Sequence, residues 1–467
     1  MDLLISLIGR VNLIKMAVLP KFLFLFQNIP IACPSLFTTI DSLISKFIWS
    51  FKHVRIKLSR LKCSPEKGGI NLPDFKLYYH VAQLRSVWFW SKYHIEGYTP
   101  SWLNIEQNIF QPLMMKSLKY IDNIEDLGEI MKNPILNHTL KCWQNCQKRM
   151  GSNNKIYTCT PLWNNPTLPF GFSDGILHRW KQAGIYTIGD LCKDGLFKDF
   201  SSVKNKYSLT SADSYKYLQL KSWIKAKTGK SFPKINESPL GLEIETMISP
   251  KKLIAELYSM INKHCKYEHL IKKELWEKDL GKIYTTESWE KILGDSQTIL
   301  SNTRHRLIQL NLINRTYYSP SKLHQFYKTS SSCPRCNQED ADIFHMFWKC
   351  CKLKTYWNEI FAMLCLTLQK QLPNDPSFAL LGDVEPLSIA NLNRYQKTLA
   401  LLAMAAAKKC ILVFWKNKDP PTKQQWWNKL LSYCTSEKIK YNVIGKPETF
   451  KKIWGVIFEC VNTHPGP

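Results

Sequence analysis

The stretch from Cys333 to Cys350 reads CPRCNQEDADIFHMFWKC and spaces three cysteines and one histidine in the pattern C-x2-C-x8-H-x4-C. Three thiolates and one imidazole suit a tetrahedral Zn²⁺ ion, and a C-x2-C pair can bend so that both sulfurs meet one metal. Pro334 favours such a turn because its ring fixes φ. The pattern therefore predicts a zinc knuckle that holds one ion, with the ligands Cys333, Cys336, His345 and Cys350.

The predicted site is structural rather than hydrolytic. Four protein ligands fill a tetrahedral shell and leave no position for a reactive water molecule. Cys351 is a rival for the fourth position, and the alternative without a metal is a set of unrelated buried thiols beside a surface histidine. We expect Asp340 and Asp342 to be surface acids, and His264 and His269 to be exposed side chains on a helix.

The composition indicates a folded protein with a sizeable core. The chain has 467 residues, of which 45% are apolar and 12% aromatic, enough for two to four domains. An odd number of cysteines, 15, and a thiolate site favour a cytoplasmic or nuclear protein that is not secreted. Pro20, Lys21, Pro30 and Pro34 interrupt the apolar segment 16–40, so we expect buried helix and turn there rather than a membrane span.

Positive charge is the second strong signal. Lysine and arginine number 64 against 37 acidic residues, a formal net charge of +27. Residues 1–90 carry 12 basic and 4 acidic side chains, and residues 391–467 carry 13 basic and 4 acidic side chains. Two distant regions therefore have an excess of positive charge. Because 16 tryptophans and 20 tyrosines are interleaved with these charges, nucleic acid fits better than a membrane surface or an acidic protein. The alternative is that the charges only keep the surface solvated.

Helical periodicity dominates, so the predicted fold class is mainly α: a multi-domain helical protein with a small zinc knuckle near its C-terminal third. Apolar residues recur three or four apart over residues 1–18, and Pro20 is expected to end or kink that helix. A second helix is expected over residues 35–51, with Ser35 as its N-cap. Gly184 and Gly195 are expected to be helix C-caps.

A basic cluster follows the second helix. Residues 52–67 contain six cations and a single acid, Glu66, and the C-terminal region adds further cations and a tryptophan. Phe344, Phe347 and Trp348 are able to stack on bases, but we expect at least two of them to be buried against the metal loop. The candidate nucleic-acid contacts are Lys52, Arg55, Lys57, Arg60, Lys62, Lys67, Arg335, Trp348, Lys349, Lys408 and Lys409.

Several segments carry a family resemblance. They are LIGRVNLIKMAVLPKFLFLFQNIPI (7–31), KFIWSFKHVRIKLSRLKCSPEKGGINLPDFKLYYHVAQLR (46–85), PLWNNPTLP (161–169), GIYTIGDLCKDGLF (184–197), the knuckle and AAAKKCILVFWKNKDPPTKQQWW (405–427). Together they resemble the C-terminal part of the polyprotein encoded by the second reading frame of LINE-class non-LTR retrotransposons. The resemblance covers nearly the whole chain. It implies a reverse-transcriptase thumb-like helical domain over residues 1–95, a helical connector over 96–310 and a nucleic-acid-binding region with the knuckle over 311–467.

The resemblance also implies what the chain does. A thumb and a knuckle region grip template RNA or an RNA–DNA hybrid when a reverse-transcriptase palm, upstream or separately encoded, is attached. Polymerase chemistry needs paired carboxylates that hold two Mg²⁺ ions, and the sequence has no adjacent pair of aspartates. We therefore expect a chain that begins after the palm, has no catalytic residue and is not an enzyme. The alternatives are a transposon-derived structural or interaction protein without nucleic-acid binding, and an enzyme with an unrecognised site.

Overall fold

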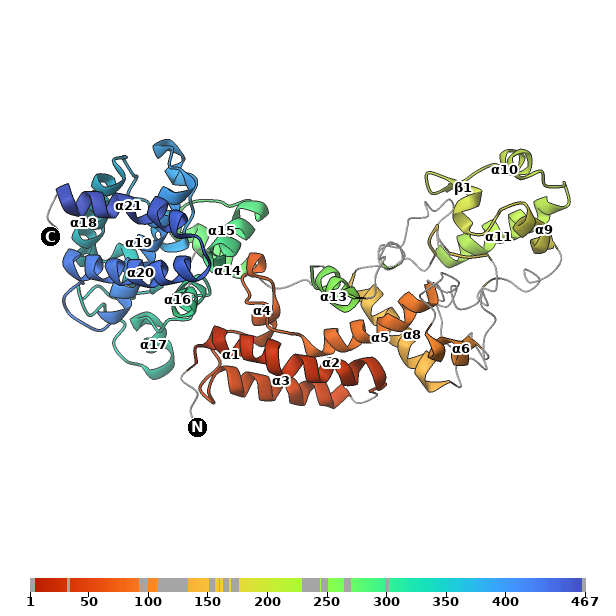
Figure 1. Ribbon diagram of the computed structural model, residues 1–467, viewed down its shortest axis with the longest axis horizontal. Coiled ribbons are helices and arrows are strands. Elements are labelled where there is room, and N and C mark those ends of the chain that lie inside the picture. The colour runs from red at the N-terminus through yellow and green to blue at the C-terminus, as the bar shows by residue number, and fades with distance from the viewer. Residues whose placement is uncertain are drawn as a thin grey trace. The chain divides into compact units, whose positions relative to one another are not determined.

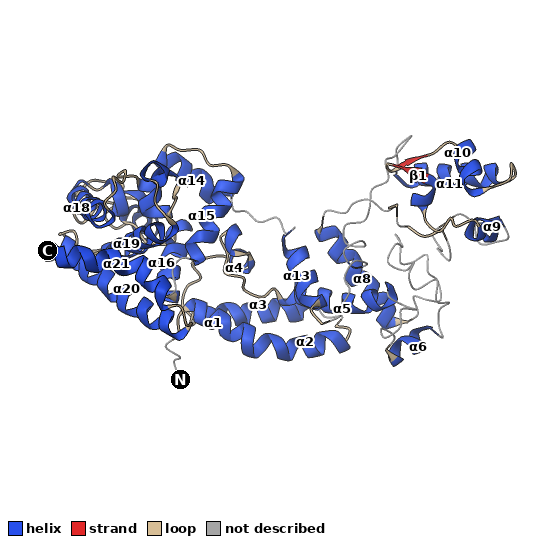
Figure 2. Ribbon diagram, turned by 45° about the horizontal axis from the view of Figure 1, so that its top comes forward, coloured by secondary structure: helices blue, strands red, loops and turns tan. Residues whose placement is uncertain are grey.

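The computed structural model describes residues 5–31, 34–91, 100–107, 133–150, 156–158, 160–162, 168, 176–228, 244, 251–263, 270–298 and 302–463. These residues are overwhelmingly helical, which confirms the predicted mainly α class (Figure 1). Figure 2 shows the small sheet, an antiparallel pair formed by β1 (Cys192–Lys193) and β2 (Leu196–Phe197). Within the described part of the chain, no helix is long and apolar enough to cross a membrane. His264 and His269 lie outside the described residues.

The chain divides into two compact units. Unit 1 comprises residues 1–15, 42–72 and 267–467, and unit 2 comprises residues 16–41 and 73–266. The predicted boundaries near residues 95 and 310 do not coincide with this division, because residues 42–72 fold with the C-terminal residues. The assignment of a thumb-like, a connector and a nucleic-acid-binding region stays a prediction.

Unit 1 is a helical assembly that includes two π turns. Its elements are α1 (Leu7–Leu13), the C-terminal part of α3 (Pro34–Ile48), α4 (Leu58–Lys62), the 3₁₀ turn η2 (Pro65–Lys67), α14 (Leu270–Leu280), α15 (Thr286–Thr298), α16 (Thr303–Ile313), α17 (Pro320–Tyr327), the π turn η6 (His345–Lys349), α18 (Cys351–Leu368), the π turn η7 (Ser377–Leu381), the 3₁₀ helix η8 (Glu385–Ala390), α19 (Arg394–Val413), α20 (Lys423–Val443) and α21 (Pro447–Thr463).

The core of unit 1 is organised around α19 (Figure 1). Alanines 405–407 are buried, and such small side chains let neighbouring helices approach closely. Helices α16, α18, α20 and α21 all pack against α19. Two aromatic donors then join its neighbours to its carbonyls: Trp426 Nε1 donates to Ala403 O (3.0 Å), and the Tyr356 hydroxyl donates to Ala407 O (3.2 Å).

The described residues of unit 2 form two separate hydrophobic cores. In the first, α5 packs against α8 and α13. Helix α2 also packs on α5. In the second, Trp180 is fully buried and its Nε1 donates to Asp213 Oδ1 (3.1 Å). The elements of unit 2 besides β1 and β2 are α2 (Leu19–Asn28), α5 (Phe75–Ser91), α6 (Ser101–Gln107), α8 (Pro134–Arg149), α9 (Ile176–Gln182), the 3₁₀ helix η5 (Ile188–Leu191), α10 (Phe200–Tyr207), α11 (Asp213–Thr228) and α13 (Leu253–Lys263).

Two expectations about the first helices need comment. Pro20 was expected to end or kink the first helix. It does not end the helical segment, because the π turn η1 (Ile14–Val18) joins α1 to α2 and Pro20 lies in the first turn of α2; a kink at this point stays a prediction. A proline is tolerated there because the wider π turn alters the hydrogen-bond ladder that its missing N–H would otherwise break. Ser35 is not an N-cap, because α3 begins one residue earlier.

The two glycines expected to be C-caps have different roles. Gly184 follows α9 with φ +89°, its N–H donates to Lys181 O, and Ile185 N–H donates to Trp180 O. These two bonds form a Schellman cap, so the prediction for Gly184 is confirmed. The prediction for Gly195 was wrong: Asp194 and Gly195, both at positive φ, are the two turn residues between β1 and β2. An Asp-Gly pair is favoured there because a two-residue hairpin turn requires positive φ.

The end of the basic segment is closed by backbone hydrogen bonds. The N–H groups of Ile70 and Leu72 both donate to Leu61 O (3.2 and 2.9 Å), and Gly69 N–H donates to Ser64 O (3.0 Å). A Cβ atom added to Gly69 would lie only 2.1 Å from the backbone oxygen of Cys63, which leaves no room for a side chain.

We expect Gly69→Ala to destabilise unit 1, because the backbone must move to relieve this clash. Overpacking of this kind typically costs about 1–3 kcal/mol. The matched control is Gly455→Ala in α21, where an added Cβ meets nothing within 4 Å and alanine favours the helix by up to about 1 kcal/mol. Thermal unfolding followed by circular dichroism should give a lower midpoint for Gly69→Ala and an equal or higher one for Gly455→Ala. Equal midpoints for the two variants would contradict the steric argument.

Lys408 is a fully enclosed cation in the core of unit 1. It is 4% exposed, and its Nζ donates to Gln309 Oε1 (2.7 Å) and Leu380 O (3.0 Å). Both partners are neutral, so no carboxylate compensates the loss of hydration, and burial lowers the pKa of Lys408 to about 7. The prediction that Lys408 contacts nucleic acid was therefore wrong, because a phosphate does not reach a buried ammonium group.

This burial predicts a pH dependence of stability. Between about pH 7 and pH 10.5 the unfolded chain holds a proton on Lys408 that the folded chain lacks, so the contribution of Lys408 to stability rises with pH across that window. Relative to the wild type, Lys408→Met should therefore have its highest unfolding midpoint at pH 6.5 and lose that advantage by pH 10. A difference between Lys408→Met and the wild type that stays constant from pH 6.5 to pH 10 would exclude the burial effect.

Candidate metal centre

Four ligand atoms converge in the knuckle as the sequence predicted. The Sγ atoms of Cys333, Cys336 and Cys350 and a ring nitrogen of His345 all lie within 4.8 Å of one another. The Sγ atoms of Cys333 and Cys350 are 3.8 Å apart, and Cys336 Sγ is 3.3 Å from His345 Nε2. Sulfur atoms bound to one tetrahedral Zn²⁺ at about 2.3 Å are separated by about 3.8 Å, so the spacing fits a single ion.

A tight loop positions the first two ligands. Asn337 N–H donates to Cys333 O (2.9 Å), and Cys333 N–H donates to Gln338 O (2.8 Å). Asn337 adopts φ +58°, a conformation that asparagine tolerates better than most residues. The loop therefore turns back on itself within the C-x2-C motif, as Pro334 led us to expect.

A π turn positions the other two ligands. Cys350 N–H donates to His345 O (3.1 Å), which closes the turn η6 over five residues instead of four. This wider turn carries residues five apart toward the same side of the chain and explains why the interval is H-x4-C. Asp342 Oδ1 accepts the backbone N–H of His345 (2.7 Å) and so caps the start of the turn. Asp342 thus has a structural role beyond that of the surface acid we expected.

Burial affects the protonation of two ligands, Cys350 and His345, before a metal binds. Cys333 and Cys350 are completely buried, and His345 is 4% exposed. Burial raises the pKa of the Cys350 thiol to about 12, although a backbone hydrogen bond from Lys352 at the start of α18 acts in the opposite direction. Burial also lowers the pKa of His345, which favours the neutral imidazole that binds metals. A cation that binds here must displace thiol protons, so its affinity falls at low pH.

Arg335 supplies a positive charge beside the thiols. It is 5% exposed, and its guanidinium donates to Met346 O (2.9 Å) and Phe414 O (3.4 Å). Burial lowers the pKa of Arg335, whereas nearby Cys350 and Cys333 act to raise it. Three thiolates and Zn²⁺ carry a net charge of about −1, which one arginine balances. The prediction that Arg335 contacts nucleic acid was wrong; its place inside the C-x2-C loop was the signal of this other role.

The remaining knuckle residues separate into buried and exposed groups. Cys351, the rival ligand, is exposed in the first turn of α18 and outside the ligand group. Phe344 and Phe347 are buried in the core, as expected for at least two of the three aromatics. Trp348 is half-buried, with its ring centroid 5.1 Å from that of Trp357. Four described ligands and their burial make this a closed group, typical of a structural site.

The basic segment remains at the surface for most of its length. Lys52, Arg55 and Lys57 are exposed, Arg60 and Lys67 are half-buried, and Lys62 is largely buried at 8% exposure. In the C-terminal region Lys349 is exposed and Lys409 is half-buried. The structure therefore leaves the cations of residues 52–57 best placed to meet a phosphate.

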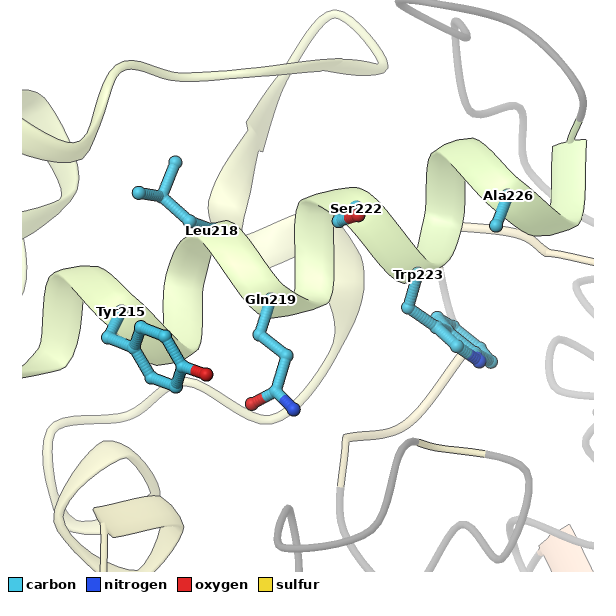
Figure 3. Close-up of a pocket in the computed structure, with 6 residues that line it drawn as sticks. All are labelled: Tyr215, Leu218, Gln219, Ser222, Trp223 and Ala226. Atoms are coloured by element: carbon cyan, nitrogen blue, oxygen red, sulfur yellow. The ribbon is translucent and has the colours of Figure 1, made fainter.

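An open pocket of about 500 Å³ lies along α11 in unit 2 (Figure 3). Its lining residues recur three or four apart on that helix, and Figure 3 shows Tyr215, Gln219 and Trp223 projecting from the same side. Tyr215 and Leu218 are exposed. Among the described residues that line it, there is no carboxylate, cysteine or histidine, the side chains that most often bind metals.

We expect the purified chain to contain about one zinc ion per molecule. Cys336→Ser should remove the metal and lower the unfolding midpoint, since structural zinc contributes roughly 10–16 kcal/mol of apparent binding energy in comparable peptides. Cys351→Ser is the matched control, because the same change one residue outside the ligand group should leave the zinc in place. Elemental analysis of reduced, desalted protein measures both. Wild-type protein without zinc, or loss of zinc in Cys351→Ser, would refute this ligand set.

No family model matches this chain. Its function is therefore inferred from the metal-ligand group and from the distribution of charge over the described residues.

Proposed function

We propose that this chain is a non-catalytic nucleic-acid-binding protein in which a zinc ion stabilises the knuckle and the basic segment of residues 52–67 contacts the phosphates of RNA or an RNA–DNA hybrid. The observation that carries the proposal is the exposure of Lys52, Arg55 and Lys57 on one short stretch. Exposed cations bind phosphates by releasing counterions, which requires no catalytic group.

The charge of the knuckle supports this division of roles. Since Arg335 is buried, the surface of the knuckle presents Lys349 against Glu339, Asp340 and the partly exposed Asp342. An acidic surface repels phosphate, so the metal loop contributes to the fold rather than to affinity. Zinc is the metal that we propose, because a Cys3His donor set in tetrahedral spacing favours it over metals that prefer oxygen ligands.

The resemblance to LINE-class retrotransposon polyproteins supports the same function. In that family the corresponding segments follow the palm and grip the template, so we propose RNA or an RNA–DNA hybrid as the partner and a reverse-transcriptase palm as the attached or associated catalytic part. The cytoplasm or nucleus is the proposed compartment, because thiolate ligands require reducing conditions. The second candidate, an interaction protein whose charges serve only solubility, predicts no salt-dependent RNA binding.

Replacing Arg55, Lys57 and Arg60 together with alanine should weaken RNA binding about equally for different sequences. If all three contact single-stranded phosphates, the slope of log K against log salt should decrease by about two, since each contact contributes about 0.7. Fluorescence anisotropy with labelled 20-mer RNAs over a series of salt concentrations measures both quantities.

The matched control replaces three exposed cations elsewhere in unit 1, Lys278, Lys352 and Lys354, with alanine. This control variant removes the same amount of positive charge. A general effect of net charge would therefore weaken RNA binding equally in both triple variants. Neither triple variant should have a lower unfolding midpoint or a lower zinc content than the wild type. Equal effects of the two variants would refute the assignment to residues 52–67, and the absence of salt-dependent RNA binding by the wild type would favour the interaction protein.

A further inference from the structure

Cations from three stretches that are far apart in the sequence gather in unit 1. Arg55 and Arg60 come from the basic segment and Lys272 comes from α14. Arg315 and Lys322 come from the third stretch, the turn after α16 and the helix α17 that follows it. Burial lowers the pKa of Lys272, and the charges of Lys322, Arg315 and Arg60 lower it further. Burial and then Arg55 lower the pKa of Lys322 in the same way. Lys272 is therefore near Lys322, Arg315 and Arg60, and Lys322 is near Arg55.

Two members of this cation cluster, which comprises Arg55, Arg60, Lys272, Arg315 and Lys322, lie over the ring of Tyr318. The guanidinium carbon of Arg55 is 5.6 Å and Lys322 Nζ is 5.4 Å from the centroid of the Tyr318 ring. The ring is 38% exposed, and Trp415 Nε1 fixes its backbone by donating to Tyr318 O (3.1 Å). Lys322 Nζ also donates to Arg315 O (3.4 Å), which holds the turn before α17 against the lysine.

Two cations of the cluster lack an acidic partner. Neither Lys272 nor Lys322 forms an ion pair with an acid among the described residues. Arg315, by contrast, pairs with Asp279 and lies over the Trp276 ring, 4.3 Å from its centroid, so it is held by the protein itself. Holding Lys272 and Lys322 near like charges costs free energy, and a bound anion would recover it.

We propose that the cation cluster binds consecutive phosphates of a single-stranded RNA, with Tyr318 as a platform for a base or a ribose. This inference rests on the proposed function and extends the phosphate contacts from the basic segment to Lys272 and Lys322. A strand fits better than a single inorganic phosphate, because exposed Lys52 and Lys57 continue the positive surface along the same segment as Arg55. Exposed aromatic rings beside cations are typical of sites for single-stranded nucleic acids.

The test uses the full chain and a labelled 20-mer oligouridylate in anisotropy titrations over a series of salt concentrations. The double variant Lys272→Gln with Lys322→Gln should lower the slope of log K against log salt by about 1.4, at 0.7 per lost contact. Its unfolding midpoint should be equal to or higher than that of the wild type, because repulsion is relieved. A purely structural role for these lysines would instead lower the midpoint.

The matched control, Lys278→Gln with Lys354→Gln, removes two exposed cations outside the cluster and should keep the wild-type slope. Equal slopes of log K against log salt for the two double variants would refute RNA binding by the cation cluster, but they would not contradict the proposed function. A wild type that does not bind RNA would overturn both.

A measurement without a substitution covers the case in which the double variant fails to fold. Oligouridylate that carries 4-thiouridine should crosslink on ultraviolet irradiation to the peptide around Tyr318, between residues 314 and 328. Excess unlabelled RNA should compete for this crosslink, whereas 10 mM inorganic phosphate should not. Crosslinks confined to other peptides, or equal competition by inorganic phosphate, would overturn the inference.

Discussion

Three thiols and one imidazole converge on one point in unit 1. The neighbouring structure depends on this constraint. The C-x2-C loop, the π turn η6 and the start of α18 each place one or two of the four ligand atoms. Aromatic residues of the knuckle then pack into the same core as α18 and α19, and Trp357 Nε1 donates to Phe347 O (2.9 Å). A local metal group is thereby joined to the main hydrophobic core, so its effects extend beyond the 18 residues that contain it.

Burial divides the cations of this protein into two classes that have the same chemistry but different effects. Arg335 and Lys408 satisfy backbone carbonyls or an amide inside the core. Arg55 and Lys57 remain exposed to solvent. Formal net charge counts both classes equally, although only the second adds to the field outside the molecule. The effective positive surface is thus smaller and more localised than the composition suggests.

Most features that depend on neighbouring residues were predictable from the sequence, whereas features that depend on distant residues were not. The ligand set, the mainly α class and the Schellman cap at Gly184 each follow from a short pattern. Gly195 was misassigned because an Asp-Gly pair also satisfies a hairpin turn, and Pro20 because a π turn leaves no simple periodic signal. Lys272 and Lys322 were not predicted, because only the fold brings Lys272 near Arg60 and Lys322 near Arg55. The burial of Lys408 was hidden for the same reason.

The π turn between His345 and Cys350 also limits how the knuckle can vary in length. Each residue added to or removed from a helical segment rotates the rest of the helix by about 100°. A one-residue deletion here would restore an ordinary α turn and still leave a histidine and a cysteine on one side of it. The same deletion would swing α18 about its axis, so that Trp357 and Phe361 would face away from the core that they now fill. The number of residues between His345 and Cys350 therefore determines which face of α18 is turned toward the core.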